Sequence, residues 1–266
     1  ALLARASQED DRVIAFEPRA DSVAVTDRTA SRTSGSRRWA IAAGLGAVLL
    51  TAASVYLHEM LTDRAGDVLA TAHGEQRVWR LPDGSVVRLN SGSELRTRFS
   101  QTDRLVEVTR GQAMFEVATD PNRPFRVVAR RTEVVALGTA FEVYCKEEAT
   151  VVTVLTGKVA VYRKDDVGGV MVPVAPLTAG EQVRVSHDES SVKVARVDLV
   201  RTLAWTQQQI IFEEERLADV AREFNRYGQV PLEVLDDQLR DLCITGIFNA
   251  YDTDSFVGFL RRLEGV

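Results

Sequence analysis

The side chains that could act as nucleophiles or metal ligands are few and widely spaced in this chain. Its three histidines, His58, His73 and His187, lack the spacing of a metal site. Its two cysteines, Cys145 and Cys243, are too few for a disulfide framework. No Ser/His/Asp set, Cys/His set or phosphate-binding loop is recognisable. We therefore expect no enzyme active site of these classes, no metal and no cofactor.

The period-2 apolar pattern that contains Phe141 and Val143 continues to Cys145. This pattern predicts that Cys145 is a small buried hydrophobic residue rather than a reactive thiol. A disulfide between Cys145 and Cys243 is the less favoured alternative, because the two residues fall in regions of different sequence pattern.

The overall charge of the chain is slightly acidic. It carries 33 Lys and Arg residues against 38 Asp and Glu residues, a net charge of −5. A nucleic-acid-binding surface needs clustered positive charge to neutralise phosphates. The charge balance therefore argues against a nucleic-acid partner. The hydrophobic share of 45% is ordinary for a globular protein, so we expect most of the chain to form packed cores.

An uncharged run of 19 residues, 39–57, follows a pair of arginines. A helix of this length rises about 28 Å, close to the hydrocarbon thickness of a bilayer. Arginines are more frequent before the run than after it, so the positive-inside rule places the N-terminus in the cytoplasm and the bulk of the chain in the periplasm. We predict a single pass through the inner membrane. The residues that mark this prediction are Arg37, Arg38, Trp39, Leu45, Leu50 and Leu57.

Other interpretations of the apolar run stay open. A buried core helix could be equally apolar, and a cleaved signal peptide would remove the run, with the nearest small-residue pattern at Ala70–Ala72. The arginine pair is also similar to a twin-arginine export signal. Cleavage after Ala72 would leave a secreted binding module, which cell fractionation distinguishes from an anchored protein.

From residue 71 to about residue 185, apolar and polar residues alternate in short runs separated by turn residues. Phe125, Val127 and Ala129, for example, share one face of a predicted strand. The pattern gives about ten strands at intervals of roughly 8–12 residues, with no helical period between them. It predicts an all-β sandwich or roll.

The pattern changes again after residue 199. Apolar residues between Leu217 and Phe224 recur at i, i+3, i+4 and i+7, which predicts an amphipathic helix. A second helix follows a capping residue at Asp252 or Thr253. Strands are predicted at 210–212, 232–235 and 244–248. The order β-α-β-β-α describes a small α+β domain.

These patterns divide the chain into five parts. They are a cytoplasmic tail at 1–38, a transmembrane helix at 39–57, a periplasmic linker at 58–70, the all-β domain at 71–195 and the α+β domain at 199–266. The predicted fold class is a membrane-anchored, mainly β protein with one transmembrane helix.

A series of short motifs resembles the FecR family of transmembrane anti-sigma factors. The first motif, Leu81–Asn90, is similar to the L-x-D-G-S-x-V-x-L-N opening of that family. The later motifs are Arg104, Gly111–Val117, Pro124–Val127, Leu137–Val143 and Gly157–Val159. Each motif alone describes a hairpin or a strand, but their order over about 80 residues is specific.

The C-terminal domain adds to the resemblance. Residues 212–248 are similar to the short N-terminal domain of secretins and TonB-dependent transducers, which this family carries after its β domain. Family members have a longer helical cytoplasmic segment than residues 1–38, and a last strand that this chain lacks after Leu263. Gln112 also stands where the family often has Glu.

The resemblance implies a relay for cell-surface signalling. A loaded outer-membrane TonB-dependent transducer presents its signalling domain to the periplasmic part of the anti-sigma factor. Periplasmic and intramembrane proteases then cut the chain. The released cytoplasmic segment acts on an extracytoplasmic-function sigma factor that drives iron-siderophore uptake genes.

The resemblance also implies one chemical site, at Gly138 and Thr139. Some family members cleave themselves between the equivalent Gly and Thr, where the Thr hydroxyl attacks the preceding carbonyl. The resemblance implies the same reaction for this chain. Glycine permits the distorted backbone that an N–O acyl shift needs, and threonine supplies the nucleophile. The alternative is structural, with Gly138 marking a bulge or a close approach in a strand.

The alternative function is that of a membrane-anchored periplasmic hydrolase, binding protein or envelope protein with no sigma partner. Such a hydrolase should show a convergent catalytic or metal-binding set in the β domain. None is recognisable in the sequence.

Overall fold

The structure is a computed structural model, which describes residues 51, 53, 54, 66–165, 169–188 and 191–263. The tail at 1–38 lies outside these residues, as do Trp39, Leu45, Leu50 and Leu57 of the predicted span and the arginine pair before it. No helix among the described residues is long and apolar enough to cross a membrane. The membrane anchor therefore stays a prediction.

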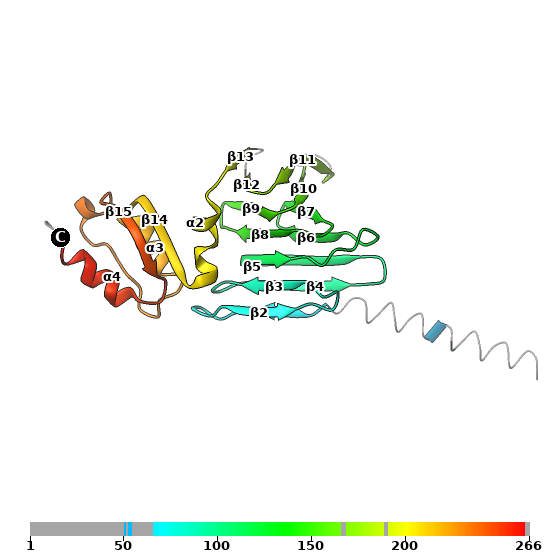
Figure 1. Cartoon of the computed structure of the whole chain (residues 1–266), viewed down its shortest axis with the longest axis horizontal. Helices are drawn as coiled ribbons and strands as arrows, with labels where there is room; N and C mark the ends of the chain where they lie inside the picture. The colour runs from blue at the N-terminus through cyan, green and yellow to red at the C-terminus, as the bar shows by residue number, and fades with distance from the viewer. Residues whose placement is uncertain (1–50, 52, 55–65, 166–168, 189–190, 264–266) are drawn as a thin grey trace, which may run out of the picture. The chain divides into compact units, whose positions relative to one another are not determined.

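Residues 68–196 form the β domain, in which neighbouring strands are mostly antiparallel (Figure 1). Its strands are β1 (Val68–Ala70), β2 (Arg77–Arg80), β3 (Val86–Leu89), β4 (Glu94–Phe99), β5 (Arg104–Glu116), β6 (Phe125–Ala129), β7 (Thr132–Ala136), β8 (Ala140–Cys145), β9 (Ala149–Thr156), β10 (Lys158–Lys164), β11 (Met171–Thr178), β12 (Glu181–Ser186) and β13 (Val192–Arg196). The prediction of a mainly β domain is confirmed. The predicted linker, 58–70, contains strand β1. Its residues form a strand rather than a linker because they pair with β4.

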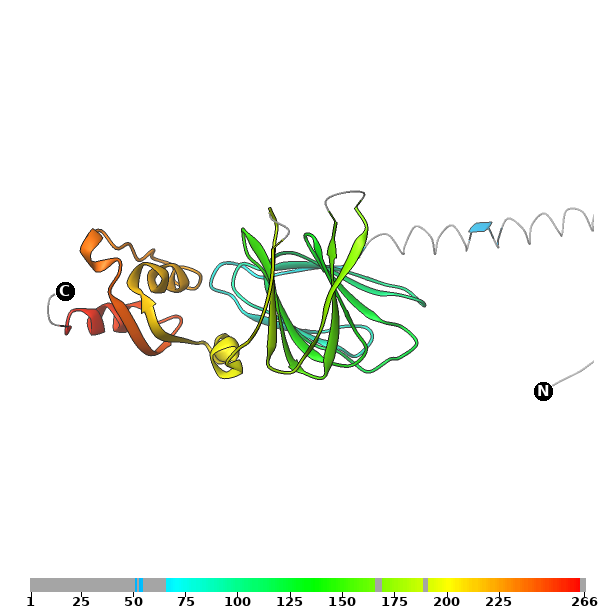
Figure 2. The same ribbon diagram turned by 90° about the horizontal axis from the view of Figure 1, so that it is seen from above.

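The long strand β5 connects the two halves of the β domain. Its first half pairs with β4 in antiparallel fashion and with β6 in parallel, and its second half pairs with β3 and β8. One half-sheet runs β11-β10-β7-β6-β5, and the other continues β5-β8-β9-β12-β13. Figure 2 shows the strands curving around a common interior, so that the sheet is nearly closed.

Alternating apolar side chains fill this interior. The ring of Phe115 lies at its centre, with centroid distances of 5.3 Å to Phe141 and 5.8 Å to Phe125. Burying one such side chain stabilises a fold by about 1.5–3 kcal/mol relative to leaving it exposed. Cys145 is buried in the same core and is a free thiol, as is the exposed Cys243. The prediction that Cys145 acts as a small buried hydrophobic residue is confirmed.

The C-terminal module follows a short connection made of α2 (Leu199–Leu203) and the 3-10 helix η1 (Ala204–Gln207). Its elements are β14 (Gln209–Arg216), α3 (Leu217–Phe224), the 3-10 helix η2 (Asp237–Leu239), β15 (Cys243–Asn249) and α4 (Thr253–Leu260). The predicted apolar face of α3 is buried, and Phe224 stacks on Phe256 of α4 at 4.5 Å. Asp252 caps α4 by accepting a hydrogen bond from the Ser255 backbone N–H at 2.9 Å.

The predicted strand at 232–235 is wrong. These residues have no regular secondary structure, so the module has two strands and the order β-α-β-α. The Asn225 side chain explains the difference, because its Nδ2 donates to the Leu232 carbonyl at 2.9 Å and its Oδ1 accepts from the Leu232 N–H at 2.6 Å. The backbone groups that a neighbouring strand would bind are thereby satisfied by a side chain. Leu232 and Val234 still pack against the module's core, which accounts for their apolar pattern.

Candidate functional site

The predicted site Gly138–Thr139 lies in the short connection between β7 and β8. A Cβ added to Gly138 would collide with the hydroxyl of Thr119, so no side chain fits there. The Thr139 side chain is buried, and its Oγ1 has no hydrogen-bond partner within the described part of the chain. An unpaired buried hydroxyl costs about 1–3 kcal/mol, and most native structures avoid it. The Thr139 methyl packs closely against Gly157, whereas the hydroxyl makes no hydrogen bond in the described part of the chain.

The position of this loop depends on the segment 117–120. The Val117 N–H donates to the Thr139 carbonyl at 2.9 Å, and the Asp120 N–H donates to the Leu137 carbonyl at 3.2 Å. The carbonyls on both sides of the Gly138–Thr139 pair are thus held by one neighbouring segment. Whatever holds residues 117–120 in place therefore also positions the backbone on either side of the Gly138–Thr139 bond.

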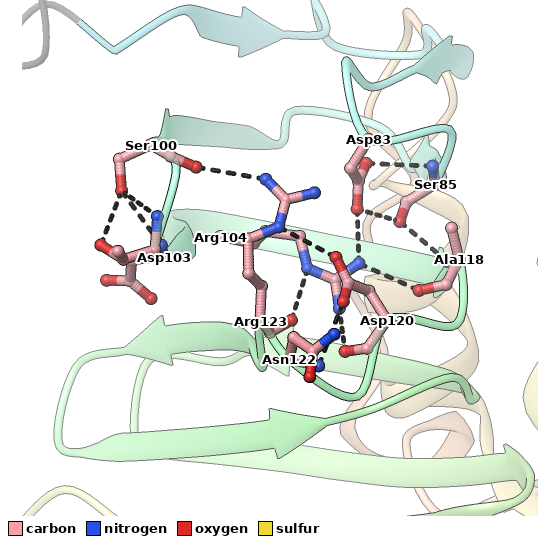
Figure 3. A network of polar contacts seen from close by, with 10 residues as sticks. Asp83, Ser85, Ser100, Asp103, Arg104, Ala118, Asp120, Asn122 and Arg123 are labelled. Carbon is pink, nitrogen blue, oxygen red and sulfur yellow. Dashed lines mark hydrogen bonds and ion pairs between the residues drawn. The ribbon is translucent and has the colours of Figure 1, made fainter.

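The fully buried guanidinium of Arg104, at the start of β5, fixes that segment. Its Nη1 donates to Asp83 Oδ2 at 2.8 Å and to the Ala118 carbonyl at 2.9 Å (Figure 3). Its Nε donates to the Arg123 carbonyl at 2.8 Å. The guanidinium carbon also lies 5.5 Å from the centroid of the Phe125 ring. The planar, multidentate guanidinium therefore ties together a turn, a loop and the hydrophobic core.

Asp83 lies in the turn that the Pro-Asp-Gly sequence predicts between β2 and β3. Its Oδ1 accepts from the Ser85 N–H at 3.0 Å, and its Oδ2 accepts from the Ser85 hydroxyl at 2.6 Å. The Ser85 Oγ in turn accepts from the Ala118 N–H at 2.9 Å (Figure 3). The Asp and Ser of the first family-like motif thus bind the same loop as Arg104.

A second buried polar cluster joins the β domain to the C-terminal module. Glu142 on β8 accepts a hydrogen bond from Trp205 Nε1 at 2.7 Å. Gln112 Oε1 on β5 accepts from Arg226 Nη2 and from Asn90 Nδ2, each at 2.8 Å. These residues form a continuous contact between strands of the β domain, the connecting 3-10 helix and the turn after α3. We call Asn90, Gln112, Glu142, Trp205, Arg226 and Tyr227 the interdomain cluster.

The protonation states of the interdomain cluster follow from its burial. Burial raises the pKa of Glu142 from 4.5 to about 7, although hydrogen bonds from Trp205 and Gln112 oppose the shift. Burial also raises the pKa of Tyr227, so its hydroxyl stays neutral. Burial is the largest single effect and lowers the pKa of Arg226, but the interactions with Glu223, Tyr227 and Tyr144 together outweigh it, and the pKa is raised.

Arg226 lies beside a cleft between the β domain and the C-terminal module, with a volume of about 970 Å³. Its guanidinium carbon lies 4.6 Å from the centroid of the Tyr144 ring, and its Nη1 lies 2.6 Å from Glu223 Oε1. Lys146 contacts the same ring, at 4.8 Å. The lining carries charges of both signs, and no group of three His, Cys, Asp or Glu residues in the described ranges could hold a metal ion.

Sequence patterns point to part of this site only. Gly138, Thr139 and Arg104 belong to recognised motifs, as do Asn90, Gln112 and Glu142 of the interdomain cluster, but the motifs do not predict that these three meet the C-terminal module. Glu142 lies between the apolar residues Phe141 and Val143, and this alternation is typical of a strand residue that faces solvent. In the structure, Trp205, 63 residues away, covers the Glu142 side chain.

The fold and these contacts define a class: a nearly closed β domain with a small α+β module attached through buried polar contacts. Within it, residues 67–160 match the family described as FecR protein, so the chain carries a FecR family domain, as the motifs predicted. No curated protein matches the chain.

Two crystal structures of a candidate anti-sigma factor from Parabacteroides distasonis are similar to this chain. One has a TM-score of 0.59 at 28% sequence identity, and the other has a TM-score of 0.58 at 29% identity. Each similarity covers 75% of this chain and 92% of the other chain. Together with the FecR domain, these similarities support an anti-sigma or related regulatory role.

Replacing Asp83 with asparagine tests the buried pair with Arg104. The variant leaves a buried guanidinium without its counter-charge, which we expect to lower the free energy of unfolding by about 3–5 kcal/mol. Urea unfolding at pH 7 measures the loss. In the control Asp237→Asn, the lost pair with Arg240 is exposed, and the expected change is within about 0.5 kcal/mol. Equal losses in the two variants would contradict the role of Arg104.

Replacing Glu142 with glutamine tests the effect of burial on its pKa. Because the folded-state pKa of about 7 lies above the unfolded value, the folded chain binds this proton more tightly. Its contribution to stability is complete below about pH 4.5 and is lost as the pH rises to about 7. The stability of Glu142→Gln relative to the parent should therefore rise by about 3 kcal/mol between pH 5 and pH 8.

Urea unfolding of both proteins at several pH values measures this difference. Glu116→Gln is the matched control, because this glutamate lies on the neighbouring strand β5 and is exposed. A pH-independent difference for Glu142→Gln, like that expected for Glu116→Gln, would contradict a raised pKa at Glu142.

Proposed function

We propose that this protein is a transmembrane anti-sigma regulator of the inner membrane, which passes a periplasmic signal to an extracytoplasmic-function sigma factor. The match of residues 67–160 to the FecR family carries the proposal. The similar structures of a candidate anti-sigma factor support a sigma factor as the cytoplasmic partner. The predicted span at 39–57 would place residues 1–38 on the side of that partner.

The C-terminal module is the part we propose as the receiver of the signal. Its resemblance to the short domain of TonB-dependent transducers suggests docking of a transducer's signalling domain, with iron-siderophore uptake as the regulated process. β15 pairs with β14 alone among the described strands, and Ile247 at its middle is 64% exposed. An exposed aliphatic residue on a strand with a free edge suits docking by another domain. Periplasmic and intramembrane proteases would then cut the chain.

A sigma-dependent reporter in living cells tests this proposal. The assay pairs this protein with each extracytoplasmic-function sigma factor of its own organism in turn, and the signal is a siderophore that the organism takes up. With the full chain, transcription should respond to the siderophore. We expect Ile247→Asp to reduce the response at least about tenfold, because a charge on the docking strand opposes desolvation.

The matched control is Val194→Asp, which places the same charge on an exposed position of β13 in the β domain, at 50% exposure. It should keep the response. A chain that lacks residues 1–38 should lose control of the reporter altogether. Normal control without residues 1–38 would show that the protein does not act through the sigma factor in the proposed way.

We also propose that the chain cleaves itself between Gly138 and Thr139. The Thr139 Oγ would attack the Gly138 carbonyl carbon, the peptide C–N bond would break, and the freed amine of Thr139 would take up the hydroxyl proton. Water would then hydrolyse the ester to give residues 1–138 and 139–266. The buried, unpaired Thr139 hydroxyl supports this proposal, because it is not committed to another acceptor in the described part of the chain.

Thr139→Ala should abolish cleavage, since it removes the nucleophile, whereas Thr139→Ser should retain it. Denaturing gel electrophoresis and intact-mass spectrometry of the purified proteins measure the fragments. Thr132→Ala is a matched control. The Thr132 hydroxyl is also buried and has no hydrogen-bond partner among the described residues, but Thr132 is the first residue of β7 and lies away from the proposed cleavage site. A single intact band from both the parent and Thr139→Ala would contradict self-cleavage.

A further inference from the structure

The first strand of the β domain is a short strand at the edge of its sheet. β1 comprises three residues, and it pairs only with β4 in the described structure. Val68 is 56% exposed. Backbone bonds flank it at both ends, from the Thr97 N–H to the Asp67 carbonyl and from the Thr71 N–H to the Ser93 carbonyl, each at 2.9 Å. As a short edge strand, β1 is nevertheless expected to open more easily than a central strand. It is also the described strand nearest in sequence to the predicted membrane anchor.

The segment after β1 leaves the sheet and contacts the C-terminal module directly. His73 Nε2 lies 2.8 Å from the Gly228 carbonyl, which accepts its hydrogen bond. Gly74 adopts a φ of +74°, and a Cβ on it would lie 2.8 Å from the Tyr227 carbonyl. The close approach therefore requires glycine at position 74.

The turn after α3 also binds the neighbouring β3–β4 connection. The Ser91 hydroxyl donates to the Arg226 carbonyl, and the same Oγ accepts from the Gly74 N–H at 2.8 Å. Ser91 thus connects the segment after β1 with the backbone of the C-terminal module. Residues 226–228 therefore contact both the segment after β1, through His73, and the β3–β4 connection, through Ser91.

Asn90 extends the connection to the end of β1. Its Nδ2 donates to the Tyr227 hydroxyl at 2.9 Å, and its Oδ1 accepts from Gln76 Nε2 at 3.0 Å. Its carbonyl accepts from the Thr71 hydroxyl at 2.6 Å. Thr71 directly follows the last residue of β1. Asn90 and Thr71 therefore connect the Tyr227 hydroxyl with this strand.

From these contacts we propose that the turn Arg226–Gly228 is a latch that holds residues 71–76 and, through them, strand β1. While the C-terminal module stays docked, the strand nearest the predicted anchor stays closed. Displacement of the turn by a partner that docks on the module would remove the bonds of His73, Ser91 and Asn90 to the turn together and open β1. This last step rests on the proposed function, whereas the latch itself does not.

Hydrogen exchange of the full chain, read by mass spectrometry on peptides that cover residues 66–76, tests the latch. The double variant Arg226→Gln/Tyr227→Phe removes the side-chain bonds to Gln112 and Asn90. We expect exchange at residues 68–72 to accelerate about tenfold, as the loss of one or two net hydrogen bonds predicts. His73→Ala, a single change at an exposed side chain that removes the bond to the Gly228 carbonyl, should act in the same direction.

The matched control is Arg222→Gln/Tyr251→Phe, which makes the same changes one turn earlier on α3 and at an exposed tyrosine. Its exchange at residues 68–72 should equal that of the parent. Exchange in β9 reports the fold of the β domain. Faster exchange in β9 of the Arg226→Gln/Tyr227→Phe variant would mean that the double variant disturbs the whole β domain. In that case the exchange of His73→Ala tests the latch. Unchanged exchange at residues 68–72 in His73→Ala overturns the latch.

The sigma-dependent reporter separates the latch from the proposed function. A chain with His73→Ala should activate the reporter without siderophore, because β1 is already open. Faster exchange together with a silent reporter would overturn the release step. A reporter that does not depend on residues 1–38 would overturn the proposed function and leave the exchange result standing.

Discussion

The buried guanidinium of Arg104 holds the β domain's most irregular region in place. It binds a carboxylate in the first hairpin, two backbone carbonyls of the loop after β5 and the face of a core ring. A buried charge is tolerated only when its partners satisfy it in good geometry, so each partner is constrained in return. The loop that Arg104 holds is the one that hydrogen-bonds on both sides of Gly138–Thr139. The backbone on either side of Gly138–Thr139 is therefore positioned in part by a charge at the start of β5.

Two strands connect this region with the C-terminal module. β5 begins at Arg104 and carries Gln112 in its second half, and β8 begins directly after Thr139 and carries Glu142. The N-terminal ends of these two strands lie at the Arg104 network. Gln112 and Glu142, further along the strands, belong to the interdomain cluster. Because paired strands are stiff elements, the module and the Gly138–Thr139 loop share a physical connection. The same module reaches the segment after β1 through His73 and Ser91.

Much of the fold could be predicted from periodicity. The alternation in Phe125–Ala129 and Phe141–Cys145 identified core-facing strands, and the spacing from Leu217 to Phe224 identified the buried face of α3. The prediction failed at 232–235, where apolar alternation was real but the Asn225 side chain satisfied the backbone in place of a strand. Periodicity reports which residues face a core. It does not report which groups satisfy the backbone.

Local spacing and residue type are enough to predict the mainly β character, the core faces of the strands, the FecR motifs and the Gly-Thr pair. Which polar residues are buried depends instead on the packing of segments that are distant in the sequence. Glu142 reads as solvent-facing until Trp205 covers it, and Arg104 reads as a surface arginine until three segments close around it. Tertiary contacts also decided that the module's turn meets the start of the β domain, 155 residues away. The physical reason is that burial depends on what a distant segment covers, and local pattern carries no record of that segment.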